Sequence, residues 1–570
     1  MKLFKKDKHK KEWEKYYPKD KLNPQVPDLS IYEYLRNSNL DNMDRVAIRY
    51  FDTRMTYREL FDEINVCARA FKSQGIRPGD VVSICMANTP EAIIAFYALN
   101  KIGAIANMIH PLSAEEEIKN TLKVSKSVML ITLNQTYANI KNIINDTDVY
   151  KIIIVSPKDS MRLFLGLGYY ITADHKIKVP KSNELYMKWN DFMLKGEQYK
   201  ENVVVHTEKD TPAIILHSGG TTGVPKNILL SNGNINVVIE QAKIALPDTN
   251  SDDKMLAILP LFHCFGLVEG IHFPLCTGQT CILVPRFDAK RFDKLLRKYK
   301  PTIIPGVPTL FEALLSNKHM NNVDLSNVKY IVSGGDTLPP ERNRLVNEFL
   351  KEHNCKSHII QGYGMTETSG GVIFGALGSD VLGSCGIPLP GNDVKIVNIE
   401  TKEEMPTGEI GEMLLAGPSV MLGYLDNEKE TNEILEKDEN GKIWVHTGDL
   451  AYLNKDGVVF YVSRLKRMLI VSGYNVYPSH IEEVLDSHPY VLNSGVIGVP
   501  HPYKVQVPKA FIVLKEGIKP TPKVKKEIKD YCTKKLAKYM LPKDYVFKEA
   551  LPKTMVGKVD YKQLEKEENE

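Results

Sequence analysis

The sequence lacks any apolar run long enough to cross a membrane. No stretch reaches the roughly 18 apolar residues of a transmembrane helix, and the N-terminus is too polar for a secretory signal peptide. The nearest candidate is Leu163–Ile171 (LFLGLGYYI), which is short and follows Arg162. We expect this segment to be buried, and a shallow contact with a membrane or lipid is the alternative.

The sequence is also poor in paired cysteines. Its eight cysteines are scattered without CxxC spacing, and the closest pair, Cys276 and Cys281, has no accompanying histidine cluster. This pattern predicts neither a zinc site nor a disulfide framework, and it suits a reducing, cytoplasmic location.

A strong charge of one sign is absent as well. The 74 basic and 70 acidic residues leave a net charge of +4, which gives no argument for a nucleic-acid partner. Charge is uneven only at the ends, where residues 1–12 carry six lysines and the tail from Glu565 is mostly acidic. We expect solvated termini. Weak contact of the lysine-rich start with the inner face of a membrane is the alternative.

What is present is the composition of a large globular protein, with 570 residues, 43% of them apolar, and therefore two or more domains. From about Arg45 to about Leu350, helical and strand patterns alternate. Tyr57–Lys72 has helical spacing, Val81–Met86 reads as a strand, and Thr89-Pro90 is a typical helix start. Such alternation predicts an α/β fold with parallel sheets covered on both faces.

The pattern of predicted secondary structure changes further along the chain. After Gly383, short strand patterns between Gly and Pro turns predict a β-rich subdomain over about 383–465. From about Lys466 the alternation returns, with helices predicted at Ser479–Ser487 and Pro522–Tyr539. We therefore expect an N-terminal domain over 1–465 and a C-terminal domain over 466–570.

The segment Ala213–Leu230 (AIILHSGGTTGVPKNILL) indicates a phosphate site. A predicted strand, Ala213–Leu216, runs into a glycine-rich loop whose N–H groups and threonine hydroxyls can surround an anion, and a lysine adds positive charge. The spacing is not that of the Walker P-loop. The candidate binding residues here are Ser218, Gly219, Gly220, Thr221, Thr222, Gly223 and Lys226.

SGGTTGVPK resembles the signature loop of the adenylate-forming (AMP-binding) superfamily, which includes acyl-CoA synthetases, adenylation domains of peptide synthetases and beetle luciferases. The double glycine is most similar to the bacterial long-chain fatty-acyl-CoA synthetases. His217 stands where an aromatic residue is common, and Asn227 where glycine is usual. Further motifs follow in family order from about Met55 to Asp560, nearly the whole chain.

Gln361–Ser369 (QGYGMTETS) resembles the second ATP motif of this superfamily. Its glycines let the backbone approach a ligand, Tyr363 offers a flat face for adenine, Thr366 can bond a phosphate, and Glu367 supplies an oxygen of the kind that Mg²⁺ prefers. The candidate nucleotide-binding residues are Gln361, Gly362, Tyr363, Gly364, Met365 and Thr366, with Thr221 and Glu367 as candidate catalytic and metal residues.

The resemblance implies roles for four later segments. Asp449 in WVHTGDL would hold the ribose hydroxyls, and Arg464 would reach ribose or phosphate. Lys466 would be the hinge residue. Gly473 and Tyr474 would line the pantetheine tunnel, and the catalytic Lys558 in PKTMVGKVD would bridge the substrate carboxylate and the α-phosphate.

The implied fold is α/β: a large N-terminal domain of stacked mixed sheets with helices and a small β-rich subdomain, and a smaller mobile α+β C-terminal domain. The implied reaction consumes ATP with Mg²⁺, forms an acyl-adenylate and passes the acyl group to coenzyme A. Rotation of the C-terminal domain about Lys466 would separate the two half-reactions. Family members are often homodimers.

The acid is predicted less directly. The acyl pocket is expected near Leu261–Gly266, Gly306–Leu310 and Ser333–Asp336, which are apolar around one histidine, His263, predicted to orient the carboxylate as a catalytic residue. Gly335, Asp336 and Thr337 are included among the cofactor-binding residues. An apolar tunnel favours a medium-to-long-chain fatty acid. An aryl or other carboxylic acid, or loading of an acyl carrier protein, are the alternatives.

Overall fold

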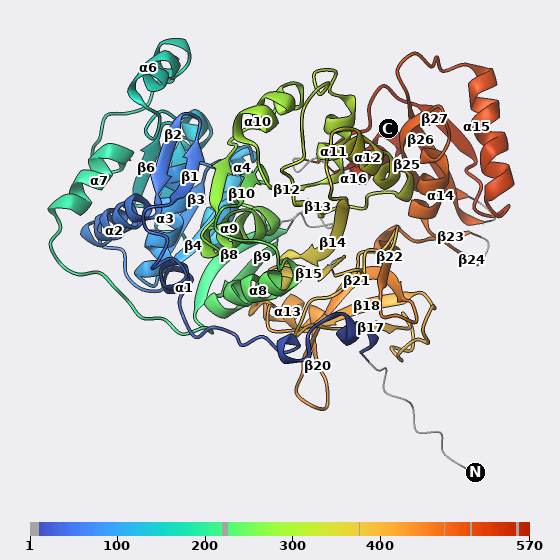
Figure 1. The fold of residues 1–570 in the computed structure, drawn as a ribbon, viewed down its shortest axis with the longest axis horizontal. Helices are drawn as coiled ribbons and strands as arrows, with labels where there is room; N and C mark the ends of the chain where they lie inside the picture. Colours follow the sequence, from blue (N-terminus) through green and yellow to red (C-terminus); the bar gives the residue numbers. More distant parts are fainter. Residues whose placement is uncertain are drawn as a thin grey trace.

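The computed structural model describes residues 11–218, 226–375, 377–471, 474–501, 504–554 and 558–569. These residues form four sheets with helices packed between and around them (Figure 1). Two large sheets make up the N-terminal part of the chain, and a smaller sheet follows. The last sheet is formed by the C-terminal part of the chain, at the right of Figure 1. The α/β class and the mixed sheets that the sequence predicted are confirmed.

The first large sheet is parallel in its middle and antiparallel at both edges. Its strands, in order across the sheet, are β16 (Ile387–Pro388), β15 (Gly370–Phe374), β14 (Ile359–Met365), β13 (Tyr330–Ser333), β12 (Ile303–Gly306), β10 (Lys254–Ala257), β11 (Thr280–Leu283), β1 (Val46–Tyr50) and β2 (Thr53–Thr56).

The second large sheet is also mixed, with an antiparallel edge formed by β8, β9 and β19. Its strands, in order, are β19 (Gly423–Tyr424), β9 (Lys226–Ser231), β8 (Pro212–Ser218), β4 (Ile105–Ile109), β3 (Val81–Cys85), β5 (Met129–Leu133), β6 (Lys151–Val155) and β7 (Tyr186–Lys188).

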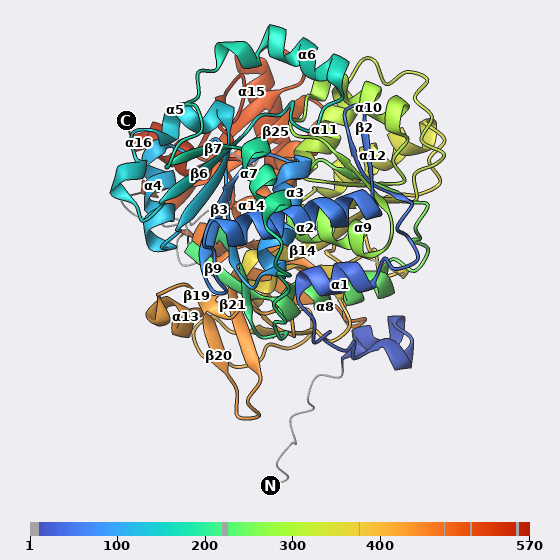
Figure 2. The same ribbon diagram turned by 90° about the vertical axis from the view of Figure 1, so that its left-hand side faces the viewer.

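Helices fill the space between these sheets and cover their outer faces (Figure 2). Helix α3 is the central one: all of its residues, Pro90–Lys101, are buried, as expected for a helix that is apolar nearly all round. The N-terminal helices are α1 (Ile31–Asn37), α2 (Tyr57–Ser73), α3 (Pro90–Lys101), α4 (Glu115–Val124), α5 (Tyr137–Ile140), α6 (Leu163–Thr172), α7 (Trp189–Gln198), α8 (Asn232–Ala245), α9 (Phe273–Cys276), α10 (Phe292–Tyr299), α11 (Pro308–Ser316) and α12 (Pro340–Glu352).

The third sheet forms the β-rich part and the fourth the C-terminal part. The third contains β17 (Asp393–Val397), β18 (Gly411–Ala416), β21 (Ile443–Leu453), β20 (Leu435–Lys437) and β22 (Val459–Arg464), with helix α13 (Glu428–Ile434) nearby. The fourth contains β24 (Tyr474–Val476), β23 (Leu469–Val471), β26 (Val505–Leu514), β25 (Val491–His501) and β27 (Asp544–Phe547), with α14 (Pro478–Asp486), α15 (Pro522–Lys535) and α16 (Tyr561–Asn569).

The predicted boundary falls on a short helix, Leu465–Arg467, that links β22 of the third sheet to β23 of the fourth. A separate core of apolar side chains lies beneath the fourth sheet. The division at 465/466 itself stays a prediction.

Two local predictions need correction. Helix α15 ends at Lys535 rather than Tyr539, because the chain turns there to bury Leu536 and Met540 in the C-terminal core. The segment Leu163–Ile171, expected to be buried, forms helix α6 with no buried residue, and Phe164 is 90% exposed.

Helix α6 protrudes from the body at the upper left of Figure 1. Within the described parts of the chain, no helix is long and apolar enough to cross a membrane.

Candidate active site

Strands β8 and β9 form an antiparallel hairpin that carries the predicted phosphate loop. Ser218 and Lys226 lie opposite each other at its end. The candidate residues Gly219, Gly220, Thr221, Thr222 and Gly223 fall outside the described residues. The Lys226 ammonium is 2.7 Å from a carboxylate oxygen of Glu430 and 4.5 Å from the ring centroid of Tyr424. Lys226 is therefore held beside the loop by residues from the β19–α13 region.

The two departures from the family pattern, His217 and Asn227, contact each other. They are cross-strand partners, and His217 Nδ1 lies 2.8 Å from Asn227 Oδ1. On the other side, His217 Nε2 lies 2.7 Å from Asn107 Oδ1 on β4. Burial lowers the pKa of His217 to about 4, so the ring is neutral at neutral pH. The hairpin is thus joined to the adjacent strand by a polar chain instead of an aromatic contact.

The second motif lies on β14 and the short helix Thr366–Thr368 that follows it. Gly364 must be glycine, because a Cβ there would come within 2.0 Å of the Gly370 carbonyl oxygen on β15. Gln361, Gly362 and Met365 lie on the same strand. The side-chain amide oxygen of Gln361 accepts a hydrogen bond from Leu338 N at 3.3 Å, just after the Gly335–Thr337 segment.

Tyr363 from this strand connects to the predicted ribose-binding carboxylate. The Tyr363 hydroxyl donates to Asp449 Oδ2 at 2.5 Å, and Arg464 Nε lies 3.0 Å from Asp449 Oδ1. Asp449 and Arg464 are also cross-strand partners on β21 and β22. Asp449 is 1% exposed, and burial raises its pKa against the opposing effects of Arg464 and the Tyr363 hydrogen bond.

Lys558 comes to this cluster from the far end of the chain. Burial lowers the pKa of Lys558, the carboxylates of Asp336 and Asp449 act in the opposite direction, and the Arg464 charge acts in the same direction as burial. Burial, assisted by the Lys558 charge, lowers the pKa of His263 to about 4. Lys558 therefore lies within electrostatic reach of both the nucleotide-motif carboxylates and His263.

The surroundings of Glu367 are compatible with its predicted role as a Mg²⁺ ligand. It is 7% exposed, and its Oε1 accepts a hydrogen bond from Tyr424 at 2.9 Å. Among the described residues, no group of three or more His, Cys, Asp or Glu side chains could hold a metal ion. One carboxylate completed by substrate phosphates is the usual way in which proteins hold Mg²⁺. Thr366, also buried, precedes it.

The three apolar segments predicted for the acyl pocket meet one another. Gly334 N donates to the Gly306 carbonyl oxygen at 3.0 Å, and a Cβ at Gly334 would lie 3.1 Å from Phe265 Cε1. A Cβ at Gly335 would lie 3.5 Å from Val307 Cγ1. The ring of Phe265, from the segment that also carries His263, thus packs where Gly334 leaves room.

One of the described predicted positions, Tyr474, lies on the surface of the C-terminal part. Tyr474 lies on β24, the edge strand of the C-terminal sheet, is 57% exposed and stacks on Tyr539 with ring centroids 4.6 Å apart. Its neighbour Gly473 falls outside the described residues. Lys466 lies on the linking helix Leu465–Arg467.

Sequence reasoning assigned no role to Glu269. This residue lies on a π-helix, Phe265–His272, a rare geometry that is frequent at functional sites. Its Oε1 accepts a hydrogen bond from Gly371 N at 2.5 Å, and its Oε2 is buried with no partner among the described residues. Burial raises its pKa to about 8. The sequence feature that could have identified Glu269 is its position as a lone glutamate in the apolar run PLFHCFGLVEG.

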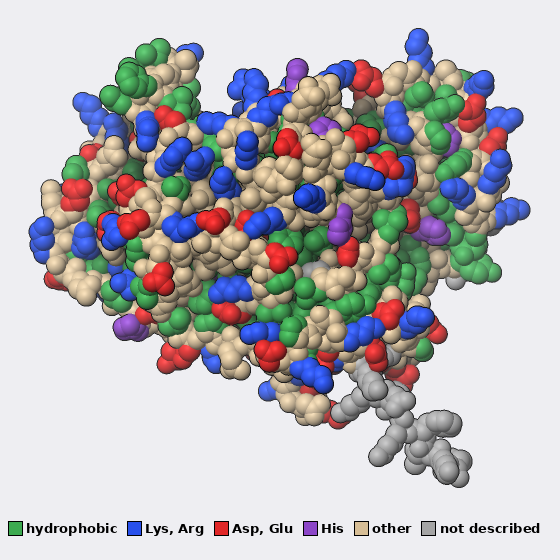
Figure 3. Space-filling view, in the orientation of Figure 1, with side chains coloured by type: hydrophobic (Ala, Val, Ile, Leu, Met, Phe, Trp, Pro, Cys, Tyr) green, Lys and Arg blue, Asp and Glu red, His purple; other side chains and the backbone are tan. Residues whose placement is uncertain are grey.

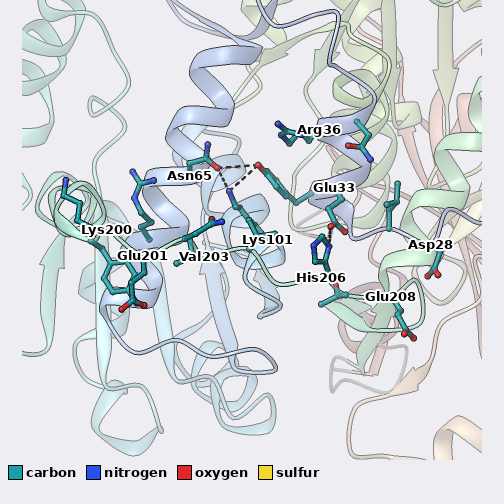
Figure 4. A pocket seen from close by; sticks show the side chains of 18 of the residues that line it. Asp28, Glu33, Arg36, Asn65, Lys101, Lys200, Glu201, Val203, His206 and Glu208 are labelled. Atoms are coloured by element: carbon teal, nitrogen blue, oxygen red, sulfur yellow. Dashed lines mark hydrogen bonds and ion pairs between the residues drawn. The ribbon is translucent and has the colours of Figure 1, made fainter.

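A cavity of about 1070 Å³ lies elsewhere, between α1, α2, α3 and the segment 199–208 (Figure 4). Lys101 is at its base, bonded to Asn65, with burial and nearby arginines lowering its pKa to about 8. His206 pairs with Glu33, and both side chains line the cavity. The lining mixes acidic and basic side chains, and none of the predicted site residues belongs to it.

Comparison with known proteins identifies the family. The model of the AMP-binding enzyme family matches residues 35–425, and that of the AMP-binding enzyme C-terminal domain matches residues 480–558. Because the first match covers more than half of the chain, the protein belongs to the AMP-binding, or adenylate-forming, family. This confirms the resemblance seen in the motifs.

Individual relatives cover nearly the whole chain. The long-chain-fatty-acid–CoA ligase of Bacillus subtilis (strain 168) is 30% identical over 565 residues, 98% of either chain. A probable 4-coumarate–CoA ligase 1 of Dictyostelium discoideum is 32% identical over 508 residues, 88% of either chain. Among solved structures, the anthranilate CoA ligase AuaEII in complex with anthranoyl-AMP superposes with a TM-score of 0.83 at 26% identity, covering 95% of this chain and 98% of that one.

Proposed function

We propose that the protein is an acyl-CoA synthetase that activates a medium-to-long-chain fatty acid with ATP and transfers the acyl group to coenzyme A. One observation carries the proposal: the charge of Lys558, in the C-terminal part, interacts with Asp449 and Arg464 and also with His263. A cation that interacts with both a nucleotide motif and the segment expected to line the acyl pocket is suited to a site where a carboxylate would meet the α-phosphate of ATP.

In the first half-reaction the substrate carboxylate attacks the α-phosphorus and pyrophosphate leaves. Negative charge builds on the phosphoryl oxygens, so positioned donors and cations accelerate the step. The phosphates would be held by the hairpin loop 218–223, including Thr221, and by Lys226. Tyr363 would contact the adenine, and Asp449 would bind the ribose. Lys558 would neutralise charge at the α-phosphate. Bound Mg²⁺, held by Glu367 and Thr221, would supply further charge neutralisation.

In the second half-reaction the thiol of coenzyme A attacks the acyl carbonyl and AMP leaves. The proposed rotation about Lys466 would withdraw Lys558 and bring the Gly473–Tyr474 segment to the site. The exposed position of Tyr474 supports this two-state scheme, because a side chain on the surface of the C-terminal part can meet the site after a rotation.

The identity of the acid rests on the apolar segments around Phe265 and Gly334 and on the full-length match to fatty-acid ligases. His263 would orient the substrate carboxylate as a neutral donor. An aryl acid is the second candidate, favoured by the matches to a probable coumarate ligase and to an anthranilate ligase. Loading of an acyl carrier protein would use the same first half-reaction.

The test is AMP release from ATP and Mg²⁺ with acids from acetate to oleate, benzoate and coumarate, with and without coenzyme A. Release that requires both coenzyme A and a long-chain acid is the expected result. Turnover confined to benzoate or coumarate would replace the fatty acid by an aryl acid. Acid-dependent pyrophosphate release without coenzyme A-dependent AMP release would indicate a carrier-protein acceptor.

We further propose a cytoplasmic enzyme, since all eight cysteines are free, which is typical of a reducing compartment. A homodimer, common in this superfamily, is the proposed assembly. Light scattering of the purified protein measures its mass directly, and a mass of one chain would exclude the dimer.

A further inference from the structure

We propose that helix α6 docks the protein on the surface of a lipid bilayer that contains anionic lipids. The inference rests on the residues of this helix and its flanks and does not depend on which acid the enzyme activates.

Helix α6 exposes an unusual concentration of large apolar side chains. Four residues on its outward side, Leu163, Phe164, Leu167 and Ile171, are 80%, 90%, 53% and 61% exposed. Figure 3 shows this apolar patch on the protruding upper left corner of the molecule. Exposed apolar patches on soluble folds mark contact surfaces for other molecules, because water contact with them is unfavourable.

The helix is held in this outward position by specific contacts at its base. Asp174, buried just after the helix, accepts hydrogen bonds from Asn134 Nδ2 and Ser156 Oγ, both at 2.6 Å, and pairs with Lys158. Tyr169, on the inward side, accepts a hydrogen bond from Gln135 at 2.6 Å. These polar contacts fix the inward side, so the apolar side faces away from the protein.

The charges around α6 favour a lipid surface over a protein partner of unknown chemistry. Between Arg162 and Lys181 the one acidic residue is Asp174, which is buried. Apart from Tyr170, the exposed titratable side chains of this stretch are all basic: Arg162, His175, Lys176, Lys178 and Lys181. A short apolar helix flanked by lysine and arginine is typical of interfacial membrane anchors, in which each cation near an anionic surface adds to binding.

A helix of this length, about 15 Å, is too short to span a bilayer and would lie in the headgroup region. If the proposed function holds, such a position would place the enzyme where long-chain fatty acids partition, but docking itself needs neither ATP nor acid.

Vesicle sedimentation tests the proposal without any substrate. We expect the purified protein to bind vesicles of phosphatidylcholine mixed with phosphatidylglycerol, to bind phosphatidylcholine alone more weakly, and to lose affinity as salt is added. In the variant Leu163→Ser/Phe164→Ser the vesicle partition coefficient should fall at least about tenfold. The reason is that burying each large apolar side chain in the lipid contributes a factor of this order to binding.

The matched control is Leu40→Ser/Ile443→Ser, which removes two apolar side chains that are 56% and 46% exposed on other elements. It should bind vesicles like the parent protein. Equal loss in both double variants, or no binding of the parent to the mixed vesicles, would overturn the proposal. A dimer of the parent that becomes a monomer in Leu163→Ser/Phe164→Ser would assign the helix to self-association instead and also overturn it.

Folding and activity are measured separately so that the outcomes stay distinct. Circular dichroism should show the parent fold in both double variants. AMP release in free solution should match the parent, because α6 contributes no residue to the candidate site. If AMP release fails for every acid while vesicle binding behaves as expected, the proposed function falls and the docking proposal stands.

Discussion

Replacing Glu269 by Gln should stabilise the protein, and the gain should grow with pH. The Glu269 side chain is partly buried on the π-helix, with Oε1 bonded to Gly371 N and Oε2 fully buried without a partner among the described residues. Glutamine keeps the shape and can still accept the Gly371 hydrogen bond, but it cannot ionise. The substitution therefore removes only the cost of a buried negative charge.

The size of the effect follows from the pKa. Burial raises the pKa of Glu269 from 4.5 to about 8, a difference that corresponds to about 5 kcal/mol of folding free energy. The folded state binds more protons than the unfolded chain between these two values, so the stability of the parent falls as pH rises through this window. Below about pH 4.5 the parent and the variant should be equally stable, and above about pH 8 the full difference should be present.

Urea unfolding at a series of pH values measures this difference. Other carboxyls with raised pKa values, such as the buried Glu91 and the half-buried Asp486, add slopes of the same sign, but these cancel between parent and variant. Glu115→Gln, at an exposed position on α4, is the control and should follow the parent at every pH. A stability difference for Glu269→Gln that stays constant with pH, or that shrinks as pH rises, would refute the reasoning.

Three further predictions concern the candidate site. Lys558→Ala should slow acyl-adenylate formation about a hundredfold or more but spare thioester formation from supplied acyl-adenylate; equal loss in both would contradict its role. His217→Phe and Asn227→Ala should be coupled by about 1 kcal/mol in a double-mutant cycle of unfolding, and additive effects would mean that their contact contributes nothing. Gly334→Val should lower kcat/KM for long acids roughly tenfold more than for short ones; uniform loss would place Gly334 outside the acyl pocket.

Local signals predicted much of the fold because they act within a few residues. Thr89 caps α3 as expected, accepting a hydrogen bond from Ala92 N, with Pro90 at the first helical position. The helix predicted from Tyr57 begins at that residue, because Thr56 and Glu59 form a capping box. The C-terminal end of α15 carried no comparable stop signal, since the basic pattern continues past Lys535 and only tertiary burial of Leu536 ends the helix.

Other features depend on contacts between distant segments. His217 and Asn227 were each recognised as unusual, but their pairing requires the register of β8 and β9. Glu269 meets Gly371 only through the packing of the π-helix against β15. The exposure of α6 follows from the contacts of Asp174 with Asn134 and Ser156, which no apolar periodicity could reveal.

The proposed hinge gains a physical basis from its two neighbours. Arg464, before Lys466, pairs with the buried Asp449 of the third sheet. Arg467, after it, lies 2.6 Å from a carboxylate oxygen of Glu482 on α14 and 3.4 Å from the ring centroid of Tyr561 on α16. One arginine is thus fixed to the N-terminal part and the other to the C-terminal part. A rotation that preserves both contacts must take place in the backbone between them, and Lys466 is in that interval.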